Sequence, residues 1–192
     1  MKQHVYAFLL MTIFASCTYN SVTLLSEEEL EWMDVYSSGD TVLFSAADGG
    51  IDTMIVSRTV DNLPDKFGLH CFTDYHGRGS YNNIIFHKGD HFDCLFIIRK
   101  GYNNLTYFIT RFEDRFSNPD DETLQPSDTT KVNVKGRIYD DALTIDDSNS
   151  FISENTMTNC EYFIWSKSKS LLEYKYQNGE VYTFYKKLPY KK

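Results

Sequence analysis

Four of the five histidines of this chain fall in one short stretch of sequence, with several aspartates beside them. Imidazole and carboxylate groups suit zinc and similar ions, and two hairpin strands can bring such groups together. No spacing among them matches a known ligand motif, and the run 87–91 fits a polar turn equally well. A metal-dependent enzyme and a set of solvated surface histidines therefore both remain open. The candidate ligands are His70, His76, His87 and His91.

Other catalytic patterns are missing from the sequence. There is no Gly-x-Ser-x-Gly elbow and no cysteine–histidine signature, and Gly77-Arg78-Gly79 lacks the strand-to-helix setting of a phosphate loop. The acidic pairs near residues 140 and 146 lack the glycine and glutamate of an EF-hand. We therefore expect a protein that is not an enzyme and that needs no cofactor.

Aromatic residues are abundant, at 16% of the chain. They favour pleated, half-buried surfaces, so the composition indicates β structure. A curled sheet of about eight strands either fills itself with side chains or holds one small ligand. A packed core and a carrier of an apolar ligand are thus the two interpretations. The residues expected to line such a cavity are Phe92, Phe96, Tyr107, Tyr162 and Tyr174.

The first seventeen residues carry a targeting pattern. Lys2 precedes an apolar run from Val5 to Phe14, and small residues lead to Cys17. This is the layout of a secretory signal, and it is too short to span a bilayer as a stable helix. The chain is therefore expected to divide into a signal peptide (1–16), a tether (17–23) and a single β-rich domain (24–192).

Charge excludes one class of partner. The chain has 19 basic and 27 acidic residues, so removal of Lys2 with the signal leaves 18 − 27 = −9. A chain this acidic has no electrostatic footprint for nucleic acid, and anionic lipid would repel it. Nothing in its net charge would hold the protein to a membrane.

Three cysteines remain besides Cys17. In an oxidising compartment Cys71, Cys94 and Cys160 allow one disulfide, and the sequence does not choose the pairing. The alternative is three small buried residues, because Cys94 and Cys160 each alternate with apolar neighbours. No CxxC motif is present.

One helix is expected in the mature chain. Ser26 and Glu29 have the spacing of a capping box, and Leu25 and Leu30 that of a hydrophobic staple. The helix should run about two turns, through Met33, and pack against one end of the sheet.

From Asp40 onward the apolar period is two, which is typical of strands. Asp48-Gly49-Gly50 and Asn178-Gly179 predict hairpin turns. The run 131–139 reads as one strand with Val132, Val134 and Ile138 inward, while 113–130 and 140–159 read as polar, mobile loops. We expect 8–10 hairpin-connected antiparallel strands in one curled, barrel-like sheet, with a β-sandwich as the alternative. The predicted strands are 42–46, 51–60, 69–75, 83–87, 92–99, 105–112, 131–139, 160–166, 172–176 and 181–186.

The run Phe14-Ala15-Ser16-Cys17 resembles the lipobox of bacterial lipoproteins. The resemblance implies cleavage before Cys17, a diacylglycerol on its sulfur and an acylated amino terminus. With the opening Leu-Ser-Glu-Glu-Glu-Leu-Glu-Trp and the closing Gly-Glu-Val-Tyr-Thr-Phe, both ends of the chain also resemble small Bacteroidetes outer-membrane lipoproteins of unassigned function.

That resemblance implies an address and a modification. Surface export in the group goes with acidic residues soon after the lipidated cysteine, and 18–23 has none, so the periplasmic face of the outer membrane is expected, with the cell surface as the alternative. Glycosylation in the group occurs at Asp-Thr or Asp-Ser sites, of which Thr129 fits best. We therefore expect a non-enzymatic binding or accessory module, held to the membrane by lipid, whose partner is an envelope protein or an apolar ligand.

Overall fold

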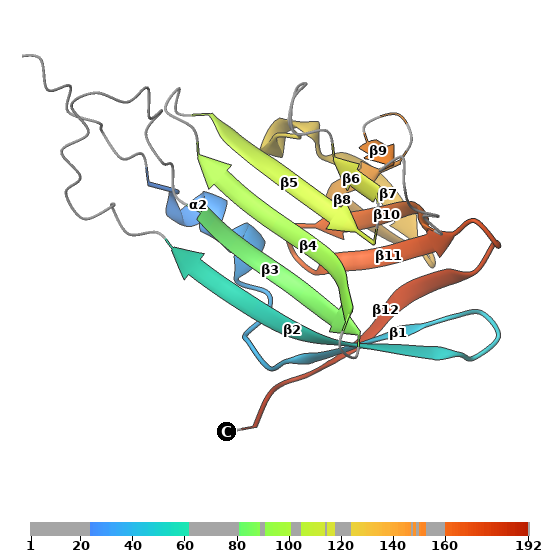
Figure 1. The fold of residues 1–192 in the computed structure, drawn as a ribbon. Coiled ribbons are helices and arrows are strands. Elements are labelled where there is room, and N and C mark those ends of the chain that lie inside the picture. The colour runs from blue at the N-terminus through green and yellow to red at the C-terminus, as the bar shows by residue number, and fades with distance from the viewer. Residues whose placement is uncertain are drawn as a thin grey trace, which may run out of the picture.

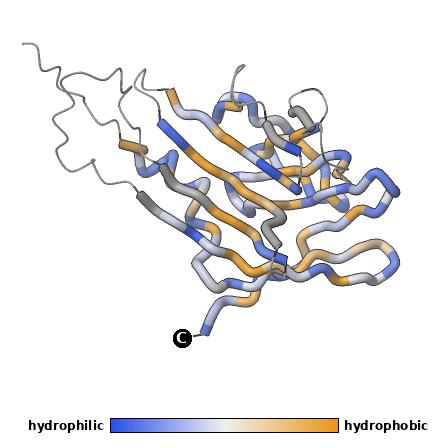
Figure 2. The backbone as a smooth tube through the Cα atoms, viewed as in Figure 1, coloured by the Kyte–Doolittle hydropathy of each residue, from blue (hydrophilic) through white to orange (hydrophobic). Residues whose placement is uncertain are grey.

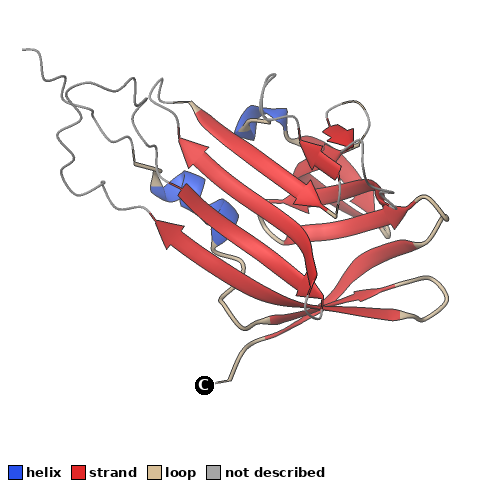
Figure 3. Cartoon of the chain, in the orientation of Figure 1, coloured by secondary structure: helices blue, strands red, loops and turns tan. Residues whose placement is uncertain are grey.

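A computed structural model of the chain describes residues 24–61, 81–88, 91–100, 105–113, 115–117, 124–146, 148, 150–152 and 160–191. Within these residues the protein is mainly β, with one short helix near the N-terminal side and one antiparallel sheet (Figures 1 and 3). The signal sequence, Cys17, Cys71, His70, His76 and the strand predicted at 69–75 lie outside the described residues.

The predicted helix is confirmed, and its cap is the reason it begins at Ser26. Helix α2 (Glu27–Leu30) continues into the 3₁₀ turn η1 (Glu31–Met33). The Ser26 hydroxyl accepts from the Glu29 amide, and the Glu29 carboxylate accepts from the Ser26 amide at 2.6 Å, which is the capping box expected from the sequence. Leu25 is buried, and Leu30 packs against the core.

The sheet runs in the order β7-β8-β10-β11-β12-β1-β2-β3-β4-β5-β6-β9, and every pair is antiparallel. Ten of its strands have five residues or more, which agrees with the predicted count, and two have three. Most neighbours are joined by hairpins. A second 3₁₀ turn, η2 (Pro126–Asp128), precedes β7. The strands are β1 (Thr41–Ser45), β2 (Ile51–Asp61), β3 (Tyr81–Lys88), β4 (His91–Lys100), β5 (Thr106–Phe112), β6 (Arg115–Ser117), β7 (Thr130–Val134), β8 (Arg137–Ile145), β9 (Ser150–Ile152), β10 (Cys160–Ser166), β11 (Ser170–Tyr176) and β12 (Val181–Leu188).

The sheet is neither closed nor strongly curled, so the barrel-like prediction is wrong in this respect. Among the described residues, β7 and β9 are edge strands with one partner each. Its two halves nevertheless face each other, because Phe96 on β4 stacks on Trp165 of β10 with ring centroids 4.2 Å apart. Figure 1 shows β2–β5 side by side, with β10–β12 at their right-hand ends in this view.

Alternation on β2, β3 and β5 separates a core face from an outer face, whereas on β4 the three consecutive residues 96–98 are all buried. On β5 the residues 106, 108, 110 and 112 are buried, and those between them are partly exposed. Most buried apolar residues form one cluster that reaches from Leu25 to Tyr174, and a second, smaller cluster holds Val134, Ala142, Ile164 and Leu172. The apolar segments of β3 and β4 appear in orange in Figure 2. No helix among the described residues is long and apolar enough to cross a membrane.

The predicted strand 131–139 is in fact a tight hairpin. Lys135 and Gly136 both have positive φ, 48° and 80°, which is the signature of a two-residue turn between β7 and β8. Lysine seldom adopts this conformation, so the sequence pattern concealed the turn. Val134 is buried as predicted, but Ile138 is 68% exposed instead of inward.

The two predicted polar loops are largely structured where they are described. Strand β8 extends to Ile145, well past the predicted boundary at Asp140. In the other loop Leu124 is buried, and its backbone carbonyl accepts a hydrogen bond from the Phe108 amide of β5. Strand β6, which falls in the same predicted loop, pairs with β5. Single buried side chains such as Leu124 hold these segments, and a composition average does not detect them.

Candidate functional site

The aromatic residues predicted to line a ligand cavity do not gather around one. Phe96 and Tyr174 are fully buried in the core. Tyr107 and Tyr162 lie on the opposite, partly exposed faces of β5 and β10, so their predicted inward orientation is wrong. For Phe92 only the backbone is described, opposite His87 and beyond a bulge that changes the register of β4. The bulge and the true strand partners decide these faces, and neither is visible in a period of two.

The space between the two halves of the sheet is filled by stacked and edge-on rings. Trp165 contacts both Phe96 and Phe86, with the latter ring at 5.6 Å. Phe112 packs on Tyr174 at 4.7 Å and on Phe163 at 5.7 Å. These distances are those of well-packed aromatic pairs. In the described part of the chain, the aromatic surplus of the sequence therefore forms core.

Of the four histidines predicted as metal ligands, the structure describes only His87 and the backbone of His91. His87 lies on the outer side of β3, opposite Ile55, whereas His91 is described by its backbone alone. Within the described residues no group of three or more histidine, cysteine or acidic side chains is arranged to hold a metal ion. The predicted site is not assembled there, and its other two members fall outside the description.

The two described cysteines, Cys94 and Cys160, are buried and do not form a disulfide with each other. Burial raises the pKa of Cys160 to about 12, although the Arg115 guanidinium opposes this rise. A thiol with such a pKa stays protonated at neutral pH and is a poor nucleophile. Both cysteines thus behave as small core residues, which is one of the two interpretations of the sequence.

A buried carboxylate that the sequence did not single out links three distant segments. Asp52 on β2 is 5% exposed, accepts a hydrogen bond of 2.5 Å from the Tyr174 hydroxyl and pairs with the Lys88 ammonium at 2.8 Å. Tyr182 stacks on Tyr174 at 5.2 Å, and Tyr176 stands edge-on to both rings. Burial and the hydrogen bond to Asp52 raise the pKa of Tyr174 far above its usual range. The cluster closes one end of the core, where the Tyr174 hydroxyl and the Lys88 ammonium both donate to the Asp52 carboxylate.

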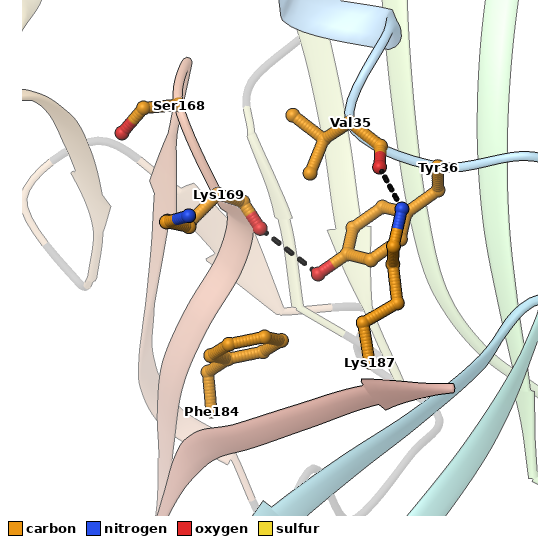
Figure 4. A pocket seen from close by; sticks show the side chains of 6 residues that line it. All are labelled: Val35, Tyr36, Ser168, Lys169, Phe184 and Lys187. Carbon is orange, nitrogen blue, oxygen red and sulfur yellow. Dashed lines mark hydrogen bonds between the residues drawn. The ribbon is translucent and has the colours of Figure 1, made fainter. Parts of the chain in front are cut away.

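A shallow hollow of about 290 Å³ opens where β11 and β12 diverge (Figure 4). Their pairing covers only residues 173–175 and 181–183, and Tyr36 occupies the gap beyond it, donating to the Lys169 carbonyl at 2.9 Å. Lys187 donates to the Val35 carbonyl at 2.8 Å and lies over the Tyr36 ring at 5.5 Å. The hollow is apolar at its walls, which Val35 and Phe184 help to form.

A second hollow, of about 430 Å³, lies between α2 and the start of β8. Thr129, the candidate glycosylation site, lines it beside Pro126, and its hydroxyl donates to the Pro126 carbonyl at 3.3 Å. Lys167 pairs with Glu31 at 2.8 Å at its rim. The other lining residues are Ser26, Glu28, Glu29, Trp32, Asp140 and Asp141, so the hollow is acidic.

Comparison with known proteins returned no family model, no curated protein and no solved structure that matches this chain.

Proposed function

We propose that this protein is a lipid-anchored lipoprotein of the cell envelope that acts as a non-enzymatic binding or accessory module on the periplasmic side of the outer membrane. The proposal combines the lipobox-like run before Cys17 with a β-domain that binds through its surface. Acyl chains on Cys17 would supply the attachment, at roughly 0.8 kcal/mol for each buried CH₂.

The packed interior is the observation that supports surface binding. Phe96, Trp165, Phe112 and Tyr174 fill the space between the facing halves of the sheet. A small-molecule carrier needs a concave, mostly enclosed cavity, and the two hollows described above are shallow and open. Recognition is therefore assigned to the outer faces of the sheet and to the hollows at their rims.

The anchor is tested by growing cells that express the wild type or Cys17→Ser with radiolabelled palmitate. We expect the wild type to carry label and to sediment with membranes, and Cys17→Ser to lose the label and become soluble, because the substitution removes the sulfur that forms the thioether. The matched control is Cys71→Ser, which should keep both properties.

Undiminished labelling of Cys17→Ser would contradict the anchor. Added protease should leave the wild type intact in whole cells, and digestion there would move the protein to the cell surface. Lipid that co-purifies with the Cys17→Ser protein in native mass spectrometry would favour the carrier instead.

A further inference from the structure

Strand β7 lies at one end of the sheet order, and β8 is its only strand partner among the described residues. Its outward side is accessible, because Lys131 and Asn133 are exposed and Val132 is half-buried. An exposed edge of this kind is a template for pairing with another strand.

The two-residue turn at 135–136 determines which backbone groups of β7 face the open side. Val134 is the last residue of β7 before this turn and pairs with the first residue of β8, so its backbone amide and carbonyl point toward β8. These directions alternate along a strand. The backbone groups of Val132 therefore also point toward β8, and those of Lys131 and Asn133 point to the open side.

Charge decides the register in which two copies of β7 can pair. The antiparallel registers that join the outward backbone groups differ in which residue lies opposite Lys131. One register places Lys131 opposite Lys131 of the second copy, and another places it opposite Lys135; like charges directly opposite each other are destabilising. In the remaining register Lys131 lies opposite Asn133, and Val132 lies opposite Val132. Only this register gives both outward residues a partner without opposing like charges.

The same register joins two apolar clusters. Val132 and Tyr139 pack against the smaller core cluster that contains Val134, on the outer side of β7, β8, β10 and β11. Val132 pairs with Tyr139 of β8, and no described strand lies on its other side. Residues opposed in a non-hydrogen-bonded pair have Cβ atoms about 5 Å apart. The opposed valines would therefore make the apolar clusters of the two copies continuous.

We propose that β7 is an interface between two copies of this chain, which pair antiparallel about a two-fold axis at Val132 and thereby join their sheets into one. The inference goes beyond the proposed function and does not depend on the lipid anchor. A two-fold pair uses the same strand of both copies and leaves neither β7 edge open. Strands of five residues make a small interface, so we expect a weak, concentration-dependent dimer.

Disulfide cross-linking tests the register in the purified full chain, held in mild detergent and carrying Cys71→Ser. We expect Val132→Cys to cross-link to its copy on mild oxidation, because opposed residues of a non-hydrogen-bonded pair have Cα atoms about 4.5 Å apart. The matched control is Thr130→Cys on the same face of β7, which would lie about 14 Å from its copy and should not cross-link. Cys94 and Cys160 are buried, and the parent protein gives the background.

Substitutions at Asn133 test the opposed charges by sedimentation equilibrium of the same protein. Asn133→Lys should weaken the dimer about twofold to thirtyfold, because it opposes lysines on both sides of the two-fold axis. Adding Lys131→Glu should restore the dimer, because each new lysine then lies opposite a glutamate. The control is Asn133→Ala, which also removes the side chain that accepts from the Gly136 amide at 2.8 Å but adds no charge, and which should dimerise like the wild type.

A wild-type protein that stays monomeric at the highest concentration reached would overturn the pairing. Equal cross-linking at positions 130 and 132 would overturn the register, as would a dimer that Asn133→Lys leaves unchanged while thermal unfolding shows the variant folded. Oligomers larger than a dimer would overturn the closed two-fold pair. None of these results bears on the lipid anchor, because palmitate labelling at Cys17 reports it separately.

Discussion

At the scale of single residues, buried carboxylates join segments that lie far apart in the chain. Asp40 is 3% exposed at the entrance to β1, where its carboxylate accepts from the Ser37 amide at 2.9 Å and from the Tyr190 amide at 3.0 Å. Burial alone would raise its pKa, but these amides and the nearby Lys187 ammonium outweigh burial and lower the pKa below its ordinary value. The charged form is therefore the one that ties the C-terminal segment to the sheet.

This gives a pH prediction for Asp40→Asn. A lowered folded-state pKa means that the contribution to stability is present above the unfolded-state value, near 4, and is lost as pH falls through the folded value. We expect Asp40→Asn to lower the free energy of unfolding at pH 7 by about 1–3 kcal/mol and to flatten its decline below pH 4. Urea denaturation from pH 2 to 7 measures both, with exposed Asp140→Asn as the control; parallel curves for wild type and Asp40→Asn would contradict the assignment.

At the scale of elements, turns and caps decide where strands begin and how the chain ends pack. Gly39 has a φ of 91°, and a Cβ built there would lie 2.8 Å from the Tyr190 ring. Its amide donates to the Val56 carbonyl, so this turn joins the start of β1 to β2 while the C-terminal segment covers it. The same left-handed conformation at Gly49, φ 90°, has nothing within 4 Å of the built Cβ.

The two glycines form a matched pair for mutation. Gly49→Ala should cost about 1–2 kcal/mol from backbone conformation alone. Gly39→Ala should cost more, by about 1 kcal/mol or above, because the new methyl group must displace the Tyr190 ring. Thermal unfolding measures the difference, and the excess should shrink when Gly39→Ala is made together with Tyr190→Ala, which removes the ring and leaves only the Cβ at 3.1 Å. An equal cost of the two single substitutions would show that the ring moves aside freely.

At the scale of the whole molecule, the domain depends on contacts between the facing halves of one open sheet. Phe96 and Trp165 are separated by 69 positions in the chain, and their rings are nearly parallel, with an interplanar angle of 3°. Their strands, β4 and β10, do not pair with each other in the sheet order. Ring packing across the core, rather than backbone hydrogen bonding, therefore joins the two halves.

A double-mutant cycle tests this packing. Phe96→Leu and Trp165→Phe should each destabilise the protein, and together by less than their sum, with a coupling of about 0.5–1.5 kcal/mol from the lost stack. Phe96→Leu combined with Val134→Ala, in the separate cluster on the outer side of β7, β8, β10 and β11, should be additive. The measurement is denaturant unfolding, and zero coupling between Phe96 and Trp165 would contradict their stacking.

Local interactions are the part of this protein that the sequence determined by itself. The Ser26–Glu29 cap, the alternation along β2, β3 and β5 and the turns at Gly49 and Gly179 were predicted because each depends on residues a few positions apart. The Lys135–Gly136 turn was missed because its first residue carries no signal for positive φ.

The tertiary structure alone decided which faces meet. Asp52 and Tyr174 are 122 positions apart, and the sequence around neither residue indicates that they form a hydrogen bond. The outward side of Tyr107 and the filling of the core by aromatic rings depend on strand order and register. Alternation of apolar and polar residues shows that a strand has two faces. Which face is buried depends on the strands and rings packed against it, and only the assembled sheet brings these together.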